Sequence, residues 1–142
     1  MIPQLLQALH DENGNVRQAA AEALGQLGAV DAMPQLIEAL SDEEWWVRWA
    51  AATALRQLND SQAFSALIPL LRDTSQNVRW AATEAIGKLG SSAAAPHLIQ
   101  ALRDGSWEVC EAAAKALQHI SEPAIIPEFL RAIKSGHTYV YK

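Results

Sequence analysis

The sequence has little that a secreted or membrane protein needs: among its 142 residues there is one cysteine, Cys110, and there are only two Tyr and two Phe. A lone cysteine cannot form an internal disulfide, which fits a reducing compartment. No apolar run is long enough to cross a bilayer, and no basic segment of the kind that opens a signal peptide occurs in the first residues, MIPQLLQALHDEN. We therefore expect a cytoplasmic protein.

Positive charge is also scarce, with 11 Lys and Arg against 16 Asp and Glu and a formal net charge of −5. Such a chain gains little from a phosphate backbone or an anionic lipid surface, so we expect neither nucleic acid nor a membrane as its partner. Gly-rich phosphate loops, Cys-x-x-Cys pairs and nucleophile elbows are absent from the sequence. The sequence therefore predicts no catalytic residues, no cofactor and no metal, in a protein that is not an enzyme.

What the sequence does contain is a repeat of 31 residues, because shifting the chain by that length aligns it with itself without a gap. Two positions depart from their columns, Cys110 from an Arg column and Ser65 from a Pro column. The aligned columns are Val16, Val47, Val78, Val109 and Val140; Asp11, Asp42, Asp73 and Asp104; Arg17, Arg48 and Arg79; Leu9, Leu40, Leu71 and Leu102; Ala23, Ala54, Ala85 and Ala116; Leu24, Leu55, Ile86 and Leu117; and Pro3, Pro34, Pro96 and Pro127.

Each unit predicts two helices, because its apolar residues recur at helical spacing on both sides of a polar break. In the second unit the break is SDEE. The apolar positions around it are Met33, Leu36, Ile37 and Leu40, and then Val47, Ala51, Ala54, Leu55 and Leu58. We call the two predicted antiparallel helices of each unit helix A and helix B.

Proline and glycine mark the predicted helix ends. The Pro column falls near the first turn of helix A, where a missing N–H costs least. Gly28 and Gly90 follow two B helices and are expected to be C-caps. Pro69 lies inside the third A helix, which we expect it to kink.

The whole chain, 1–142, is predicted to be one all-α domain, an α-solenoid of about 4.5 stacked helix pairs. The repeats run approximately over 1–28, 29–59, 60–90, 91–121 and a truncated fifth unit, 122–142. Neither end carries a polar capping repeat, so we expect a piece of a longer polypeptide. Uncapped ends also make self-association through a terminal repeat a hypothesis.

The repeat reads D-x-x-x-x-V-R-x-A-A-x-x-A-L-x-x-L-G and is followed by P-x-L-I-x-A-L. It resembles the short HEAT-like repeats of the phycobilisome-lyase type, and the arrays of cyanobacterial proteins in particular. The resemblance covers essentially all of the chain and specifies fold better than function. It implies a right-handed superhelix with A helices on the convex side and B helices on the concave side. Proteins with such repeats include phycobilin lyase subunits, sensor arrays on signalling NTPases, deoxyhypusine hydroxylase and artificial binding scaffolds.

The resemblance also implies a structural ladder, in which each Asp accepts from an Arg nearby or in the next repeat. Its members are Asp11, Arg17, Asp42, Arg48, Asp73, Arg79 and Asp104. Cys110 removes a cation, which is expected to leave Asp104, or a neighbour, less well satisfied. Since every repeat carries the carboxylate, a structural role is favoured over a catalytic one. For Cys110, a packed thiol is favoured over a nucleophile or a bilin attachment point.

The histidines do not suggest a metal site. A di-iron centre like that of deoxyhypusine hydroxylase would require repeated His-Glu pairs, and the sequence has no His-Glu dipeptide. We interpret the four histidines as scattered surface residues: His10, His97, His119 and His137.

The five tryptophans carry more information. Trp45 and Trp107 share one repeat column, Trp49 and Trp80 share another, and Trp46 lies beside Trp45. All five fall on the predicted concave side or its rim, at the N-terminal ends of the B helices. Two interpretations stay open: an exposed aromatic contact patch, or indoles that fill the groove by packing on neighbouring B helices.

The predicted partner-binding face includes these tryptophans and their neighbours on the B helices. Its residues are Trp45, Trp46, Trp49, Thr53, Trp80, Glu84, Lys88, Trp107, Glu111 and Lys115. Nucleic-acid binding by such a face would require a basic groove. Here only Lys88 and Lys115 oppose the acidic residues Glu22, Glu84, Glu108 and Glu111.

Three functions follow from these observations. The leading hypothesis is a scaffold that binds a protein or peptide through the Trp-bearing concave face, as part of a larger protein such as a signalling NTPase. Self-association through the Trp patch is a further possibility. The alternative is a phycobilin lyase-type subunit or chaperone that holds a tetrapyrrole and its acceptor protein. The third is a scaffold of engineered or structural origin with no small ligand, and the irregular positions Ser65, Pro69 and Cys110 argue against a consensus design.

Overall fold

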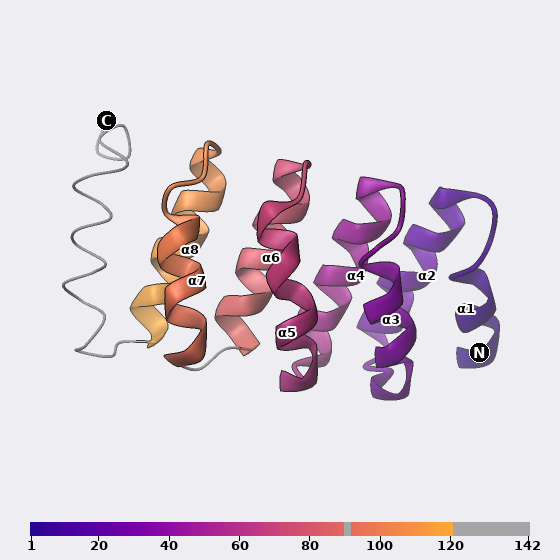
Figure 1. Ribbon diagram of the computed structural model, residues 1–142. Coiled ribbons are helices and arrows are strands. Elements are labelled where there is room, and N and C mark those ends of the chain that lie inside the picture. Colours follow the sequence, from indigo (N-terminus) through magenta and orange to yellow (C-terminus); the bar gives the residue numbers. More distant parts are fainter. Residues whose placement is uncertain (90–91, 121–142) are drawn as a thin grey trace.

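The computed structural model describes residues 1–89 and 92–120, which form stacked pairs of helices (Figure 1). The A helices are α1 (Ile2–Ala8), α3 (Met33–Ala39), α5 (Phe64–Leu67) and α7 (Ala95–Ala101). The B helices are α2 (Gly14–Gln26), α4 (Trp45–Leu58), α6 (Gln76–Leu89) and α8 (Trp107–Ile120). Short 3₁₀ turns lead into the later A helices: η1 (Val30–Ala32), η2 (Ser61–Ala63) and η4 (Ser92–Ala94), while η3 (Ile68–Arg72) continues α5. The all-α solenoid is thus confirmed, and the predicted fifth unit, with Pro127, His137 and Val140, lies outside the described residues.

The B helices stack directly on one another, α2 on α4, α4 on α6 and α6 on α8, while consecutive A helices make far fewer backbone contacts. Each A helix packs chiefly against the B helix of its own pair, as with α7 and α8. The B helices therefore form one closely packed row, and the A helices form a second row beside it (Figure 1).

The core is a continuous layer of small and medium side chains between the two helix rows. The column Leu24, Leu55, Ile86 and Leu117 is at most 3% exposed throughout. Burying a side chain of this size stabilises a fold by about 1.5–3 kcal/mol. Alanines from every B helix fill the space between these residues, so that each pair shares one hydrophobic cluster with the next.

Two glycines let neighbouring B helices approach closely. A Cβ atom added to Gly25 would lie 2.8 Å from Ala54, and one added to Gly87 would lie 2.5 Å from the Cβ of Ala116. Both distances are too short for real side chains, so glycine is required at these contacts. Arg56 occupies the equivalent position of α4, where it reaches Glu84 of α6 instead, with 3.2 Å between Nη1 and Oε1.

The predicted helix ends are largely confirmed. Gly28 has a φ of 67°, and the Gly28 and Ala29 amides donate to the carbonyls of Gly25 and Leu24, which completes a Schellman C-cap. Pro3, Pro34 and Pro96 all lie at the first or second position of an A helix. Gly90, the second predicted cap, lies outside the described residues.

Pro69 changes the third A helix in a specific way. It cannot donate a backbone hydrogen bond, and α5 ends at Leu67, after which the chain continues as the 3₁₀ helix η3. The expected kink is therefore a change of helix type.

Within the described residues, no helix is long and apolar enough to span a membrane.

Candidate partner-binding surface

The Asp and Arg columns meet along the edge where each A helix turns into its B helix. Arg17 Nε donates to Asp42 Oδ2, Arg48 to Asp73 and Arg79 to Asp104, each at 2.8 Å and 25 positions apart. The Nη2 atoms reach the other carboxylate oxygen at 3.0–3.3 Å. Each pair is bidentate and joins one repeat to the next.

The same guanidinium groups also hold their own turn. Arg48 Nη1 donates to the carbonyl of Asp42 at 2.7 Å, and Arg17 and Arg79 repeat this contact with Asp11 and Asp73. The ladder aspartates in turn accept from the amide two residues ahead, as Asp42 does from Glu44 at 2.9 Å. One Arg therefore fixes two consecutive turns. The hydrogen bond to Asp42 raises the pKa of Arg17, which is only 8% exposed.

Asp104 is better satisfied than the sequence suggested. It accepts from Arg79 of the preceding repeat and from the Ser106 amide, so the substitution at Cys110 does not deprive it of a cation. Cys110 is 1% exposed, and its Sγ lies 3.1 Å from the Asp104 carbonyl and 3.3 Å from that of Leu102. The thiol thus takes over the contact that Arg makes within its own turn.

Ser106 organises the start of α8, beside this turn. Its hydroxyl donates to Glu108 Oε2 at 2.7 Å. This hydrogen bond, together with the Glu108 backbone amide, lowers the pKa of the Glu108 carboxyl. The first turn of α8 therefore keeps a negative charge where helix N–H groups are unpaired, which is the favourable end of the helix dipole.

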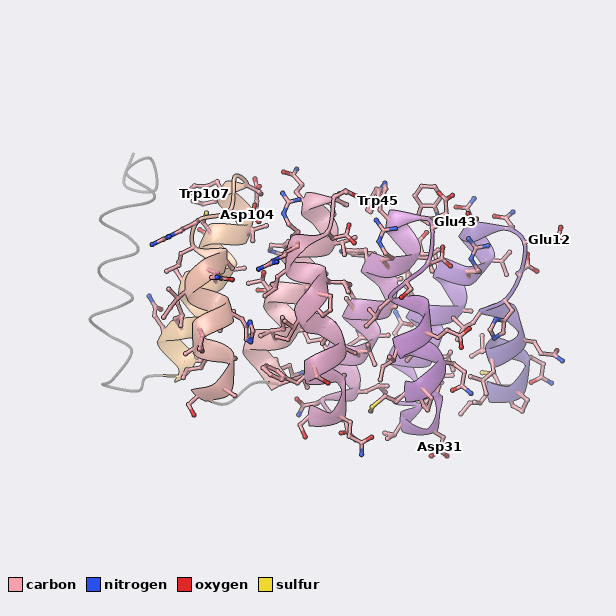
Figure 2. All side chains as sticks on the ribbon, in the orientation of Figure 1. Glu12, Asp31, Glu43, Trp45, Asp104 and Trp107 are labelled. Carbon is pink, nitrogen blue, oxygen red and sulfur yellow. The ribbon has the colours of Figure 1, made fainter. Side chains whose placement is uncertain are left out.

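The five tryptophans separate into an exposed pair and a partly buried group. Trp45 is 40% exposed and Trp107 is 48% exposed. Each is the first residue of its B helix, two repeats apart, and both lie along the edge that carries Glu43 and Asp104 (Figure 2). We call these two residues the rim tryptophans.

Trp49 and Trp80 are only partly exposed and pack against the hydrophobic core, as the groove-filling interpretation expects. Trp46 meets Trp45 edge-to-face with ring centroids 5.9 Å apart. Its Nε1 is buried without a hydrogen-bond partner among the described residues. The five indoles therefore do not form one continuous exposed patch.

The rest of the predicted face lies along the B helices and is polar. Thr53 Oγ1 donates to the Trp49 carbonyl at 2.9 Å, and Glu84 pairs with Arg56. Lys115 and Glu111 form an exposed i,i+4 pair at 3.8 Å. A hollow of about 470 Å³ between α6 and α8 is lined by Glu84, Gly87, Lys88, Ala112, Lys115, Ala116 and His119.

Among the other predicted residues, His10 and His119 are exposed, while His97 is partly buried with its ring edge-to-face against Phe64 at 6.4 Å. Within residues 1–89 and 92–120, no three His, Cys, Asp or Glu side chains converge as a metal site would require. The sequence reasoning missed the Arg56–Glu84 pair. Its signal is weak, because the position of Arg56 is uncharged in the other repeats, where it holds Gly25, Gly87 and Gln118.

The stacked antiparallel helix pairs place the chain in the class of α-solenoid repeat proteins, which bind partners along extended surfaces. The chain belongs to the HEAT repeat family, whose profile matches residues 2–75, 33–118 and 64–142.

Several solved structures share the fold of this chain. In the complex of CpcE and CpcF of phycocyanin lyase from Nostoc sp. PCC7120, one chain is 32% identical over 96% of this chain, with a TM-score of 0.77. The present chain spans 58% of the length of that protein. An engineered protein, 22% identical, covers 98% of this chain and 74% of its own length, with a TM-score of 0.72. A designed armadillo repeat protein, 21% identical, covers 99% of this chain and 78% of its own length, with a TM-score of 0.69, so both show the fold alone. None of the curated protein sequences compared with the chain matches it.

Proposed function

We propose that this chain is a non-enzymatic scaffold that binds a protein partner through its B-helix side and the adjoining rim tryptophans. The observation that carries the proposal is the exposure of Trp45 and Trp107, at 40% and 48%, at equivalent positions of two repeats. Exposed indoles of this size are enriched at interaction hot spots. Each can bury on the order of 150–250 Å² in a contact. The proposal includes a place in a larger cytoplasmic assembly such as the sensor array of a signalling NTPase.

Of the two rim tryptophans, Trp45 is held in place by its neighbours, which favours binding. Trp45 is braced edge-to-face by Trp46, and the turn before it is held by Asp42 and Arg48. A side chain that is already fixed loses little conformational entropy when a partner covers it. The rim is therefore better suited to contact than Trp49 and Trp80, which already pack against the core.

The test uses the double variant Trp45→Ala, Trp107→Ala as bait beside the wild-type chain in affinity capture from a cell extract. We expect proteins retained by the wild type to be lost with the double variant, with a weakening of at least about tenfold for two hot-spot residues. Circular dichroism should show unchanged helicity, because both side chains project from the fold.

Gln62→Ala is the matched control, since Gln62 is an exposed residue of η2, at the start of an A helix and away from both the B-helix side and the rim. It should retain the same proteins as the wild type. Equal retention by the rim variant would contradict the proposal, as would equal loss with Gln62→Ala.

A second candidate is favoured by the 32% identity to a phycocyanin lyase chain. In this candidate, the chain is a lyase-type subunit or chaperone that holds a tetrapyrrole and its acceptor protein. The hollow between α6 and α8 offers Lys88 and Lys115 to the carboxylates that bilins carry. Titration of the chain with a bilin distinguishes the candidates. A saturable absorbance shift that Lys88→Gln, Lys115→Gln removes would favour the lyase-type function.

A further inference from the structure

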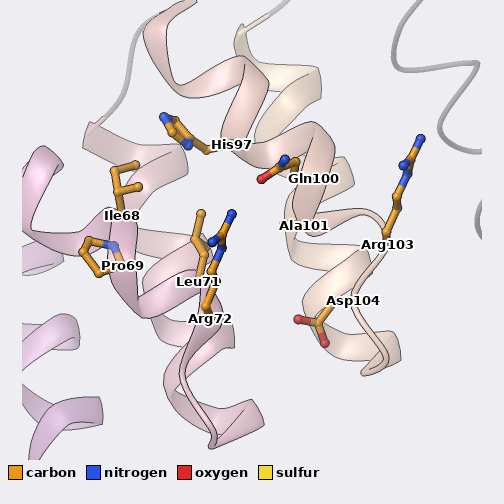
Figure 3. A pocket seen from close by; sticks show the side chains of 9 residues that line it. All are labelled: Ile68, Pro69, Leu71, Arg72, His97, Gln100, Ala101, Arg103 and Asp104. Atoms are coloured by element: carbon orange, nitrogen blue, oxygen red, sulfur yellow. The ribbon is translucent and has the colours of Figure 1, made fainter.

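A groove opens on the A-helix side, between η3 and α7, away from the B-helix surface discussed above (Figure 3). Its volume is about 660 Å³, within the range of sites that take small molecules and short peptide segments. Its walls come from the third and fourth repeats. The groove is therefore a separate candidate surface, with its own chemistry.

Pro69 sets the helix type of η3, and with it the arrangement of side chains along one wall of the groove. Because η3 is a 3₁₀ helix, side chains three positions apart line up along it. Ile68 thus aligns with Leu71, and Pro69 with Arg72, and all four residues line the groove. The result is an apolar row that runs directly beside a guanidinium group.

The groove carries unneutralised positive charge. Arg72 and Arg103 occupy equivalent positions of consecutive repeats, and neither makes an ion pair within the described part of the chain. Figure 3 shows Arg72 rising from η3 toward Gln100, with Arg103 beyond the end of α7. Asp104 also lines the groove, but its carboxylate is held by Arg79 at 2.8 Å. In a chain with a net charge of −5, this concentration of free cations favours an acidic ligand.

The corresponding groove between α1 and α3 has the opposite character. There the positions equivalent to Arg72 and Arg103 hold His10 and Ser41, and exposed Glu38 and Glu43 line the opening. The fold alone therefore does not create an anion site between A helices. The side chains of the third and fourth repeats do.

We propose that the groove between η3 and α7 binds an acidic, partly apolar peptide segment of a partner protein. Carboxylates of the segment pair with Arg72 and Arg103, and an apolar side chain covers Ile68, Pro69 and Leu71. The apolar row argues for a peptide rather than an inorganic anion, which would leave that surface exposed.

The test measures fluorescence anisotropy of a labelled short peptide of Glu and Leu residues titrated with the full chain. We expect saturable binding that Arg72→Gln, Arg103→Gln weakens about tenfold or more, because each substitution removes a charge-assisted contact. A matched peptide with Gln in place of Glu should not bind. Charge reversal, Arg72→Glu with Arg103→Glu, should transfer binding to a Lys and Leu peptide.

Lys88→Gln is the control, since Lys88 is an exposed cation outside this groove, in the hollow between α6 and α8. It should leave binding of the Glu and Leu peptide unchanged. The proposal is overturned if the peptide does not bind, if Lys88→Gln weakens it as much as the arginine variant, or if the Gln and Leu peptide binds equally. Full competition by inorganic phosphate at peptide-like concentration would also overturn it and assign a small-anion site instead.

Discussion

At the scale of single residues, Cys110 shows how one position of a repeat can change chemistry and still keep its turn in place. Where other repeats use Arg Nη1 to reach the carbonyl of their own Asp, Cys110 Sγ reaches the carbonyl of Asp104 at 3.1 Å. The position 25 residues after Cys110, where the ladder spacing would place an Asp, is Ser135 in the sequence. Both members of one Arg–Asp pair are thus replaced, which avoids leaving a carboxylate without its cation.

The burial of Cys110 has a direct consequence for its reactivity. Because the side chain is 1% exposed and is the only thiol of the chain, a thiol reagent should modify the native protein only through opening of the fold. We expect labelling by Ellman's reagent to be slower by roughly a hundredfold or more in buffer than in urea. Absorbance of the released product measures this rate. Fast, complete labelling without denaturant would show that α8 does not pack as described.

At the scale of the helices, much of the fold could be predicted because the spacing of apolar residues and prolines is decided locally. The predicted Pro positions and the Gly28 cap are found where expected. The state of Trp49 and Trp80 was not decided locally, because it depends on how closely neighbouring B helices approach. That approach is set by small residues of another repeat, such as Ala54 facing Gly25.

The tight contact between α6 and α8 allows a sharp test. Gly87→Ala should destabilise the fold by about 1–3 kcal/mol, because the new Cβ would lie 2.5 Å from the Cβ of Ala116 and overpack the interface. This cost exceeds the gain in helix propensity, which is at most about 1 kcal/mol. Urea unfolding followed by circular dichroism measures the difference.

Two further variants test whether the contact with Ala116 causes the loss of stability in Gly87→Ala. Gly87→Ala with Ala116→Gly should regain most of the loss, since it moves the methyl group to the other helix. Gly105→Ala should have little effect, because a Cβ there meets nothing within 4 Å. A neutral Gly87→Ala would mean that the two helices are farther apart than described.

At the scale of the whole molecule, stability is the sum of repeat stabilities and the interfaces between neighbours. The ladder contributes to each interface through a bidentate pair whose side chains are at most 20% exposed. The partners come from consecutive repeats, and this pairing could not be predicted from the residue spacing alone, which also allowed pairs six positions apart. The sequence identified the ladder residues, but only the stacking decided between these partners.

Breaking one Arg–Asp pair of the ladder should therefore destabilise the interface between two consecutive repeats. Arg48→Met leaves the Asp73 carboxylate and the Asp42 carbonyl without their donor, and we expect a loss of about 3 kcal/mol. The double variant Arg48→Met, Asp73→Ser should lose less stability than the two single variants added together, because Asp73→Ser removes the carboxylate that Arg48→Met leaves without a cation. The natural positions Cys110 and Ser135 likewise lack both the Arg and the Asp. Urea unfolding curves provide the free energies.

Arg72→Met is the matched control, since Arg72 is exposed and makes no ion pair among the described residues. It should change the stability by no more than about 0.5 kcal/mol. If Arg48→Met also left the free energy of unfolding unchanged, the Arg–Asp pairs would set the orientation of the repeats without stabilising them.

The position of the ladder also determines how the array can flex. All three bidentate Arg–Asp pairs lie at the A-to-B turns, and Arg56–Glu84 and the close contacts of Gly25 and Gly87 join the B helices nearer their C-terminal ends, whereas consecutive A helices make far fewer contacts. Bending should therefore leave the B-helix row close-packed and change the spacing between neighbouring A helices. The rim tryptophans, which start two B helices beside the ladder, would keep a nearly constant separation. The groove between η3 and α7, on the A-helix side, would widen and narrow as the array bends.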